Sequence, residues 1–272
     1  MLAKLLKYEF KATGRTLLPV YAVLIAMSLL VNLTVNHGNT FNNLDDSLLG
    51  ILQMVIILAY GCIIGMVCIV TVLLLIQRFY KNLLRDEGYL MHTLPVKPWQ
   101  NIMAKLVPAV LWSLLSLFMA MLSVMIIGMD LHAWAEFFRD FGYMLNRLFQ
   151  EFGIHGLLFI FELLILVFAS MANEILQVYV SLAVGHTANN RRILWSVAAY
   201  IGITIAFSFI TMLLGNICNT LGIFQYFGNM FIGHNIAVVH YVMLVSIAFI
   251  MLVNTVFFGG ANYILKRKLN LE

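Results

Sequence analysis

The sequence predicts an all-α membrane protein with six transmembrane helices. Of its 272 residues, 62% are hydrophobic and only 10% are charged. The charges stand in short groups between apolar runs, and one such run, Ile51–Ile76, contains no charged side chain. About 20 apolar residues are enough for a helix to cross roughly 30 Å of hydrocarbon. A soluble domain could not expose runs of this length, so we expect a bilayer around them.

Six apolar runs of membrane-spanning length occupy nearly the whole chain. We therefore expect a single transmembrane domain over residues 1–272, with no room for a nucleotide-binding or catalytic domain. The longer runs are expected to tilt or kink in the membrane. The expected spans are Leu17–Val35, Ile51–Ile76, Leu106–Met129, Gly156–Val184, Ile193–Leu214 and Tyr241–Leu265.

The distribution of Lys and Arg predicts that both termini are cytoplasmic, because short cytoplasmic loops carry an excess of these residues. With the N-terminus inside, only Arg139 and Arg147 of the 16 basic residues lie outside. The inner group comprises Lys4, Lys7, Lys11, Arg15, Arg78, Lys81, Arg85, Lys97, Lys105, Arg191, Arg192, Lys266, Arg267 and Lys268. We expect a multi-pass protein of the cell membrane, in a bacterial plasma membrane, in contact with membrane lipids.

The N-terminal segment Met1–Arg15 is expected to be retained. Its charged region is too long for a secretory signal, and no small-residue cleavage site follows the apolar run. One helical face carries Leu2, Leu5, Leu6 and Phe10, and Lys side chains lie mostly opposite. This pattern favours an interfacial helix on the anionic inner leaflet before the chain turns into the membrane. The alternative is an ordinary positively charged flank.

The cytoplasmic segment Arg78–Lys105 differs from a plain connector. An apolar stripe is followed there by three consecutive charges of mixed sign. The stripe consists of Phe79, Tyr80, Leu83 and Leu84, and the charges are Arg85, Asp86 and Glu87. A mixed-charge helix with exposed apolar side chains is a surface that a cytoplasmic partner could bind. The alternative is a solvated turn that only returns the chain to the membrane.

Two outer segments also have a distinctive composition. Leu131–Phe152 has aromatic and aliphatic residues every three or four positions, which predicts an amphipathic helix. Its aromatic content favours a position at the outer membrane interface, while capping a cavity between helices is the alternative. Asn216–His240 has no charge and three glycines. Re-entrant helices are plausible there if neighbouring helices cover their backbone.

Motifs for chemistry are absent from the sequence. There is no HExxH, GxSxG, Walker A or GxGxxG pattern, so we expect no enzyme activity, no catalytic residues, no bound cofactor and no metal in this chain. His234 and His240 have no acidic neighbour in the sequence and are expected to be interface histidines. Cys62 and Cys68 are expected to be small buried hydrophobic residues of the second span.

Four polar residues stand out inside the fourth span: Glu162, Asn173, Glu174 and Gln177. A carboxylate at mid-bilayer costs about 3 kcal/mol on insertion scales, so each acid should face a partner or a wet cavity. Glu162 and Glu174 lie about 120° apart around a helix, so they do not form one carboxylate pair. Glu174 is the deeper of the two. A hydrogen bond between helices and a role in transport are both open interpretations.

Three stretches carry a family resemblance. They are the opening Met1–Lys11, the loop Arg85-Asp-Glu-Gly-Tyr89-Leu with Thr93-Leu94-Pro95-Val, and Tyr179 to Gly185-His186 followed by Arg191. Together they resemble the small six-span permease subunits of ABC exporters, the ABC-2 or type V exporter-like family. The similarity of layout covers the whole chain, and the motifs cover about 40 residues, of which the loop is the most specific part.

The resemblance implies six helices, an N-terminal interfacial helix, a cytoplasmic coupling loop after the second span and re-entrant outer helices after the fifth. It implies a dimer with a second permease copy or paralogue, docked on separate ATP-binding cassette subunits that hold ATP and Mg. The coupling residues would be Leu83, Leu84, Arg85, Asp86, Glu87, Gly88, Tyr89, Leu94 and Pro95. No nucleic-acid partner is expected.

The sequence thus predicts the permease subunit of an ATP-driven exporter, and two other classes of function compete with it. One is a non-transporting immunity or sensing subunit that binds a peptide or lipid at the outer face. The other is an intramembrane enzyme, which the missing catalytic motifs disfavour. The cargo and the choice between homodimer and heterodimer are not predicted. The uncharged membrane interior favours an amphipathic or lipid-like cargo over a highly charged one.

Overall fold

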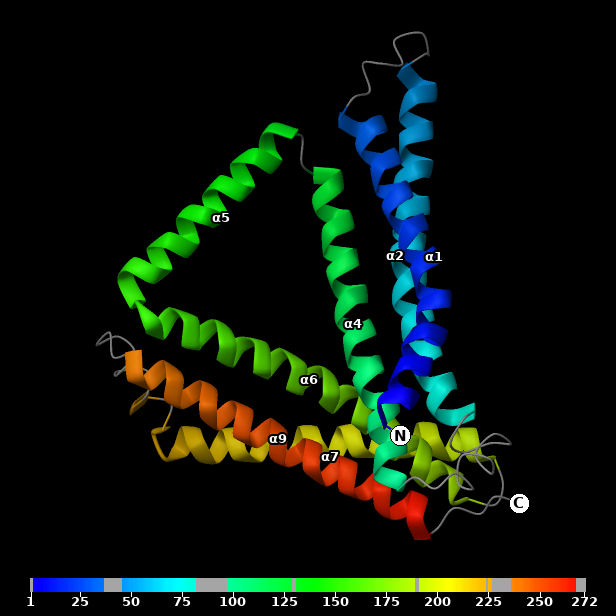
Figure 1. Ribbon diagram of the computed structural model, residues 1–272, viewed down its shortest axis with the longest axis vertical. Coiled ribbons are helices and arrows are strands. Elements are labelled where there is room, and N and C mark those ends of the chain that lie inside the picture. The colour runs from blue at the N-terminus through cyan, green and yellow to red at the C-terminus, as the bar shows by residue number, and fades with distance from the viewer. Residues whose placement is uncertain are drawn as a thin grey trace. The chain divides into compact units, whose positions relative to one another are not determined.

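The computed structural model of the protein describes residues 2–36, 46–81, 97–128, 131–188, 191–223, 225–226 and 236–267, which are almost entirely helical (Figure 1). The helices are α1 Leu2–Asn36, α2 Asp46–Phe79, α4 Pro98–Gly128, α5 Leu131–Phe152, α6 Ile154–His186, α7 Arg192–Thr220 and α9 Ile236–Arg267. Six of them, all except α5, are long and apolar enough to cross a membrane. For the described residues, the prediction of an all-α chain with six helices long and apolar enough to span a membrane is therefore confirmed.

The six long helices contain between 29 and 35 residues. At 1.5 Å per residue they are about 44 to 52 Å long, which exceeds a hydrocarbon thickness of about 30 Å. Each apolar run predicted from the sequence falls on one of these helices, except that Met129, the last residue of the third run, lies outside the described residues. Each helix continues beyond its apolar run into the more polar flanking residues. This is possible because a helical backbone satisfies its own hydrogen bonds in polar and apolar segments alike.

α1 combines the amphipathic N-terminal segment and the first span in one helix. It runs from Leu2 to Asn36 and includes Pro19, with no break between the two parts. The position of residues 2–15 on the inner leaflet stays a prediction. In the segment expected to contain re-entrant helices, α7 extends to Thr220, and Ile223, Gln225 and Tyr226 are also helical. Residues 224 and 227–235 lie outside the described part, so that expectation also stays a prediction.

The chain divides into two compact units, and each is described by itself. The first comprises residues 1–77 and 107–147, and the second comprises residues 78–106 and 148–272. The prediction of a single domain stays a prediction. The core of the first unit is a cluster of buried side chains from α1, α2 and α4, namely Leu17, Tyr21, Leu24, Val67 and Trp112. Trp112 also packs beside Gly14, where an added Cβ would lie 3.0 Å from the indole ring.

In the second unit, α6 packs against both α7 and α9 (Figure 1). α6 and α9 run parallel, since His155 near the start of α6 lies beside His240 near the start of α9. Further along, the Asn254 amide donates to the carbonyl of Ala169 at 2.9 Å. α6 and α7 run antiparallel and meet where the former ends and the latter begins.

α5 is a helix over Leu131–Phe152, as its periodicity predicts. Residues up to Arg147 belong to the first unit, and Leu148 onward belong to the second. Its position at the outer interface stays a prediction.

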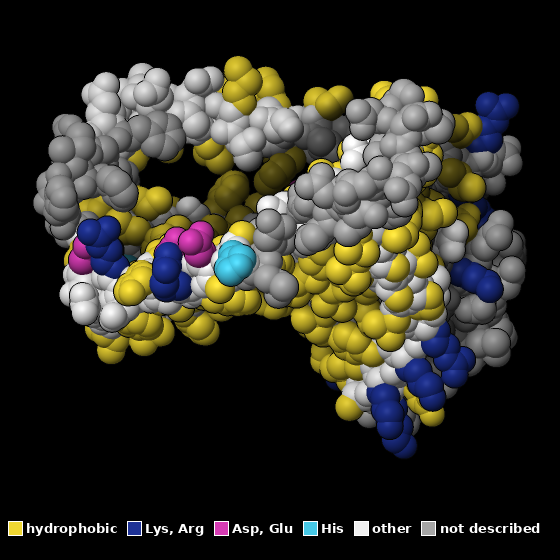
Figure 2. All heavy atoms as spheres, turned by 90° about the horizontal axis from the view of Figure 1, so that it is seen from above, with side chains coloured by type: hydrophobic (Ala, Val, Ile, Leu, Met, Phe, Trp, Pro, Cys, Tyr) yellow, Lys and Arg dark blue, Asp and Glu magenta, His cyan; other side chains and the backbone are white. Residues whose placement is uncertain are grey.

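The surface of the described helices is largely apolar. Figure 2 shows hydrophobic side chains over most of the coloured surface, with the charged side chains gathered in a few places. Along α7, Ser196 is the one residue that is buried. Cys62 and Cys68 are both exposed on α2, so the prediction that they are buried is wrong. In a membrane, lipid supplies apolar surroundings, and a small apolar side chain does not need a protein core.

Candidate functional sites

The residues assigned to coupling lie outside the described part of the chain. They are Leu83, Leu84, Arg85, Asp86, Glu87, Gly88, Tyr89, Leu94 and Pro95. The helix that leads into this loop is described as far as Lys81. Its last residues show how the loop is attached to the membrane helices.

An aromatic stack anchors the start of the loop. The ring of Phe79 lies on the ring of Tyr179 of α6, with centroids 3.9 Å apart and planes 13° from parallel. Phe79 is 0% exposed and Tyr179 is 1% exposed. The next residue, Tyr80, meets the ring of His186 edge-on at 6.1 Å. The prediction that Phe79 belongs to an exposed stripe is therefore wrong, because stacking on α6 removes its ring from any partner surface.

The turn between α6 and α7 is built on a close approach of two backbones. A Cβ at Gly185 would overlap the backbone and hydroxyl of Ser196. Arg191 precedes α7 in the left-handed conformation, with φ 53° and ψ 47°, which is uncommon for a residue with a side chain. Nη1 of Arg192 lies 3.4 Å from Nε2 of His186. Tyr179 to His186 and Arg191, which carry part of the family resemblance, thus belong to the packed junction of α6 and α7.

A cluster of ionisable side chains lies where α6 and α9 begin. Nδ1 of His240 is 2.9 Å from Oε2 of Glu162, and the side chains are 15% and 11% exposed. Nε2 of His240 is 3.3 Å from Nδ1 of His155. The sequence singled out Glu162 but not this partner, because the two residues are 78 positions apart in the chain. His234 lies outside the described residues.

The other polar residues of α6 divide between two faces. Asn173 and Gln177 are buried, and the Gln177 amide donates to Oγ1 of Thr204 on α7 at 2.6 Å. Glu174 is exposed and shares its face with Leu163 and Val167, which are 42% and 37% exposed. The structure therefore assigns Gln177 to a contact between helices and leaves the carboxylate of Glu174 uncovered by its neighbours.

The first unit contains a hydroxyl cluster that the sequence did not single out. Oγ of Ser116 on α4 lies 2.6 Å from the Tyr21 hydroxyl of α1 and 2.9 Å from Oγ1 of Thr71 on α2. Seven residues further along α4, Oγ of Ser123 lies 2.9 Å from the Tyr60 hydroxyl of α2. Hydroxyl residues are common in apolar helices, and their spacing does not reveal which of them meet across helices.

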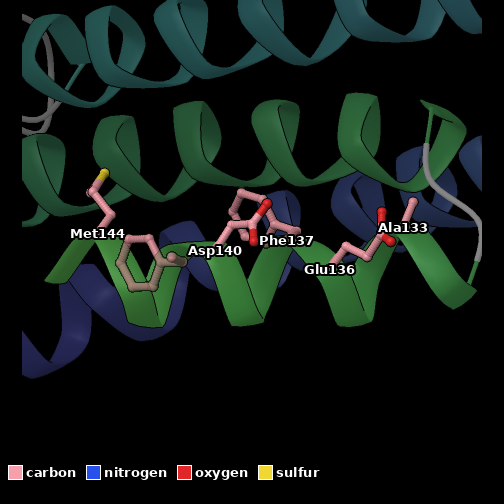
Figure 3. A pocket seen from close by; sticks show the side chains of 6 residues that line it. Ala133, Glu136, Phe137, Asp140 and Met144 are labelled. Carbon is pink, nitrogen blue, oxygen red and sulfur yellow. The ribbon is translucent and has the colours of Figure 1, made fainter. Parts of the chain in front are cut away.

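A hollow of about 480 Å³ lies along α5. Figure 3 shows the labelled side chains projecting from one side of the helix, with Glu136 and Asp140 one turn apart. Its lining residues among those described all belong to α5, and they are Ala133, Glu136, Phe137, Asp140, Phe141 and Met144. The hollow is thus a feature of a single helix, and it gives no support to α5 as the cap of a cavity between helices.

The described residues contain no group of three or more His, Cys, Asp or Glu side chains arranged to hold a metal ion. Comparison of the chain with protein-family profiles, curated proteins and solved structures finds no match. The class that the fold defines is a helical protein with six helices long and apolar enough to span a membrane, and the contact between Glu162 and His240 lies in its second unit.

Proposed function

We propose that this chain is the membrane-spanning permease subunit of an ATP-driven exporter of the ABC class. In this proposal it forms a dimer with a second copy or a paralogue, and separate ATP-binding cassette subunits hydrolyse ATP. Both termini face the cytoplasm of a bacterial cell, α5 lies outside, and lipids surround the dimer. Six long apolar helices and the family resemblance of the loop and the α6–α7 junction support this assignment.

The observation that carries the proposal is the exposed carboxylate of Glu174. It lies 12 residues before the end of α6 and 10 residues, or about 15 Å, before Val184, the predicted end of the span, which is about half of the hydrocarbon thickness. A charge facing lipid at that depth costs about 3 kcal/mol. A polar pathway or a subunit interface along this face of α6 removes that cost. A transport subunit needs such a face, and a passive anchor does not.

The attachment of the loop supports the same proposal. A loop that transmits motion from a soluble ATPase to membrane helices must be rigidly attached to those helices. Phe79, stacked and fully buried against Tyr179, provides such a joint, because moving the loop would move α6 with it. α6 also carries Glu174, so one helix connects the loop to the proposed pathway.

The first experiment tests the partner. The permease is purified from its native membranes with and without the double change Arg85→Glu and Glu87→Lys, and ATPase activity in the eluate is measured. We expect the wild-type chain to retain an ATPase and the double variant to lose most of it. Charges at such a junction fix register and partner choice. The matched control reverses two charges on α5, Arg139→Glu with Asp140→Lys, and should retain the ATPase.

The second experiment tests the pathway with Glu174→Gln in the intact complex. We expect the complex to assemble, while substrate-stimulated ATP turnover falls at least tenfold because the carboxylate no longer lines the pathway. Glu136→Gln on α5 is the control. Normal turnover in Glu174→Gln would remove Glu174 from the proposed pathway. If the wild-type chain retains no ATPase in the first experiment, the non-transporting immunity or sensing subunit is favoured instead.

Topology is tested by labelling an introduced cysteine, Asp140→Cys, with a membrane-impermeant reagent. Cys62, Cys68 and Cys218 are replaced by alanine first, since two of them are exposed on α2. We expect labelling in intact cells. Labelling only after permeabilisation would place α5 in the cytoplasm and invert the proposed orientation.

A further inference from the structure

Two histidine nitrogens face each other at the spacing of metal ligands. Nδ1 of His155 and Nε2 of His240 are 3.3 Å apart. Zinc binds imidazole nitrogen at about 2.0 to 2.1 Å in tetrahedral geometry, which places two such ligands about 3.3 to 3.4 Å apart. The histidines therefore stand at the separation that one shared ion would impose on them.

The carboxylate behind His240 adds a second, independent feature of a metal site. An ionised carboxylate only accepts hydrogen bonds, so with Glu162 ionised the contact of 2.9 Å to its Oε2 places the proton of His240 on Nδ1. The lone pair of His240 is then on Nε2, the atom that faces His155. Metal-binding histidines usually donate their other N–H to a carboxylate in this way, which fixes the tautomer and raises ligand basicity.

We propose that His155 and His240 bind a divalent transition-metal ion, Zn²⁺ or Cu²⁺, with Glu162 as the positioning residue behind His240. Imidazole nitrogen favours these ions over Mg²⁺ and Ca²⁺, which prefer oxygen ligands. Two protein ligands leave the remaining coordination positions to water. The described residues contain no group of three or more His, Cys, Asp or Glu side chains that could hold a metal ion, so the proposal relies on these two imidazoles as its protein ligands.

The site is accessible and joins two helices. His155 lies in the first turn of α6 and is exposed, so an ion can reach it from solution. Glu162 is seven residues, or about two turns, further along the same helix, while His240 belongs to α9. A bound ion would clip the start of α6 to the start of α9 and stabilise that packing, since a ligand that binds only the folded state stabilises it.

The test is a titration of the purified full-length chain in detergent with Zn²⁺, followed by calorimetry, and with Cu²⁺, followed by electron paramagnetic resonance. The purification tag carries no histidine, and Cys62, Cys68 and Cys218 are replaced by alanine so that thiolates cannot bind the metal. We expect one ion per chain, with nitrogen hyperfine coupling in the Cu²⁺ spectrum. Zn²⁺ should also raise the melting temperature of this protein.

The variants separate a metal site from a hydrogen-bonded pair of histidines. His155→Gln changes an exposed residue and should leave the fold intact while weakening binding at least tenfold, and His240→Gln should do the same. Glu162→Gln keeps a hydrogen-bond acceptor but removes the charge, and we expect a loss of about tenfold. His132→Gln, which changes an exposed histidine of α5, should bind like the parent protein. Undiminished binding in His155→Gln, or no binding by the parent protein, would overturn the proposal and leave only a hydrogen-bonded pair.

Discussion

Both units join helices through neutral hydrogen bonds, as Gln177 and Thr204 do in the second unit, and in the second unit a carboxylate and an imidazole also pair across helices. In the first unit, the hydrogen bonds across helices that meet at Ser116 and at Ser123 involve only neutral hydroxyl groups. In the second unit, α6 and α9 meet through the carboxylate and imidazole of Glu162 and His240. The junction of α6 with α7 has Arg192 beside His186.

The difference lies in what each group can do when the helices separate. The Ser116 hydroxyl also donates to the carbonyl of Trp112 in the same helix at 2.9 Å. The Thr71 hydroxyl likewise donates to the carbonyl of Val67 in its own helix at 2.7 Å. These hydroxyls therefore keep a partner within their own helix. The carboxylate of Glu162 cannot accept a hydrogen bond from a carbonyl of its own helix in place of the His240 imidazole. We therefore expect the packing at Ser116 to tolerate small movements better than the packing at Glu162 and His240.

The largest effect is expected from Gly185→Ala in the second unit. A Cβ there would overlap the Ser196 backbone, which cannot move aside as a side chain could. We expect the free energy of unfolding to fall by about 3 kcal/mol, the upper range for overpacking. It can be measured by titrating the detergent-solubilised protein with SDS. Gly202→Ala on α7 meets open space and should be neutral or stabilising, and equal effects in the two variants would contradict the close packing.

A smaller effect is expected when His240 is replaced by Leu. Glu162 then stays in a largely apolar site without its partner, and we expect a loss of about 2 kcal/mol in the same SDS titration, within the range for a polar group left unsatisfied. The double change Glu162→Leu with His240→Leu should recover most of that loss, because replacing both partners by apolar groups can be nearly neutral. Additive losses would show that the pair is not coupled.

In the first unit, Ser116→Ala is expected to cost about 1 kcal/mol. Hydrogen bonds between membrane helices average about 0.6 kcal/mol each, and this change removes two, to Tyr21 and Thr71. Ser113→Ala is the control, because the Ser113 hydroxyl bonds to the Ala109 carbonyl of its own helix. A loss as large as that of His240→Leu would remove the distinction between the two units.

The smallest effect concerns Gln177, whose amide bonds to Thr204 across α6 and α7. Gln177→Met keeps the length of the side chain and should cost about 0.6 kcal/mol, the average for one such bond. Thr204→Val should cost the same. The double variant should cost no more than either single variant if the two groups act only on each other, and this cycle can be measured by the same unfolding titration.

Much of the fold could be predicted from the sequence, and the site could be predicted only in part. The apolar run Ile51–Ile76 lies within α2, and the periodicity of Leu131–Phe152 gave α5 its correct bounds. The sequence drew attention to Glu162, Gln177 and His240, but it did not predict that Glu162 meets His240 or that Gln177 meets Thr204. Phe79 was expected to be exposed and is buried on Tyr179.

The sequence by itself determined the six membrane-length helices and α5 in the described part of the chain, because each backbone hydrogen bond of a helix closes within four residues and the bilayer admits few alternatives. Only the tertiary structure decided which side chains meet. Tyr21 and Ser116 are 95 residues apart, and Glu162 and His240 are 78 apart. Such pairings depend on which helices are neighbours and on how far each is rotated about its axis. The periodicity of the sequence indicates whether a helix face is polar or apolar, whereas the packing of the helices determines which residues contact that face.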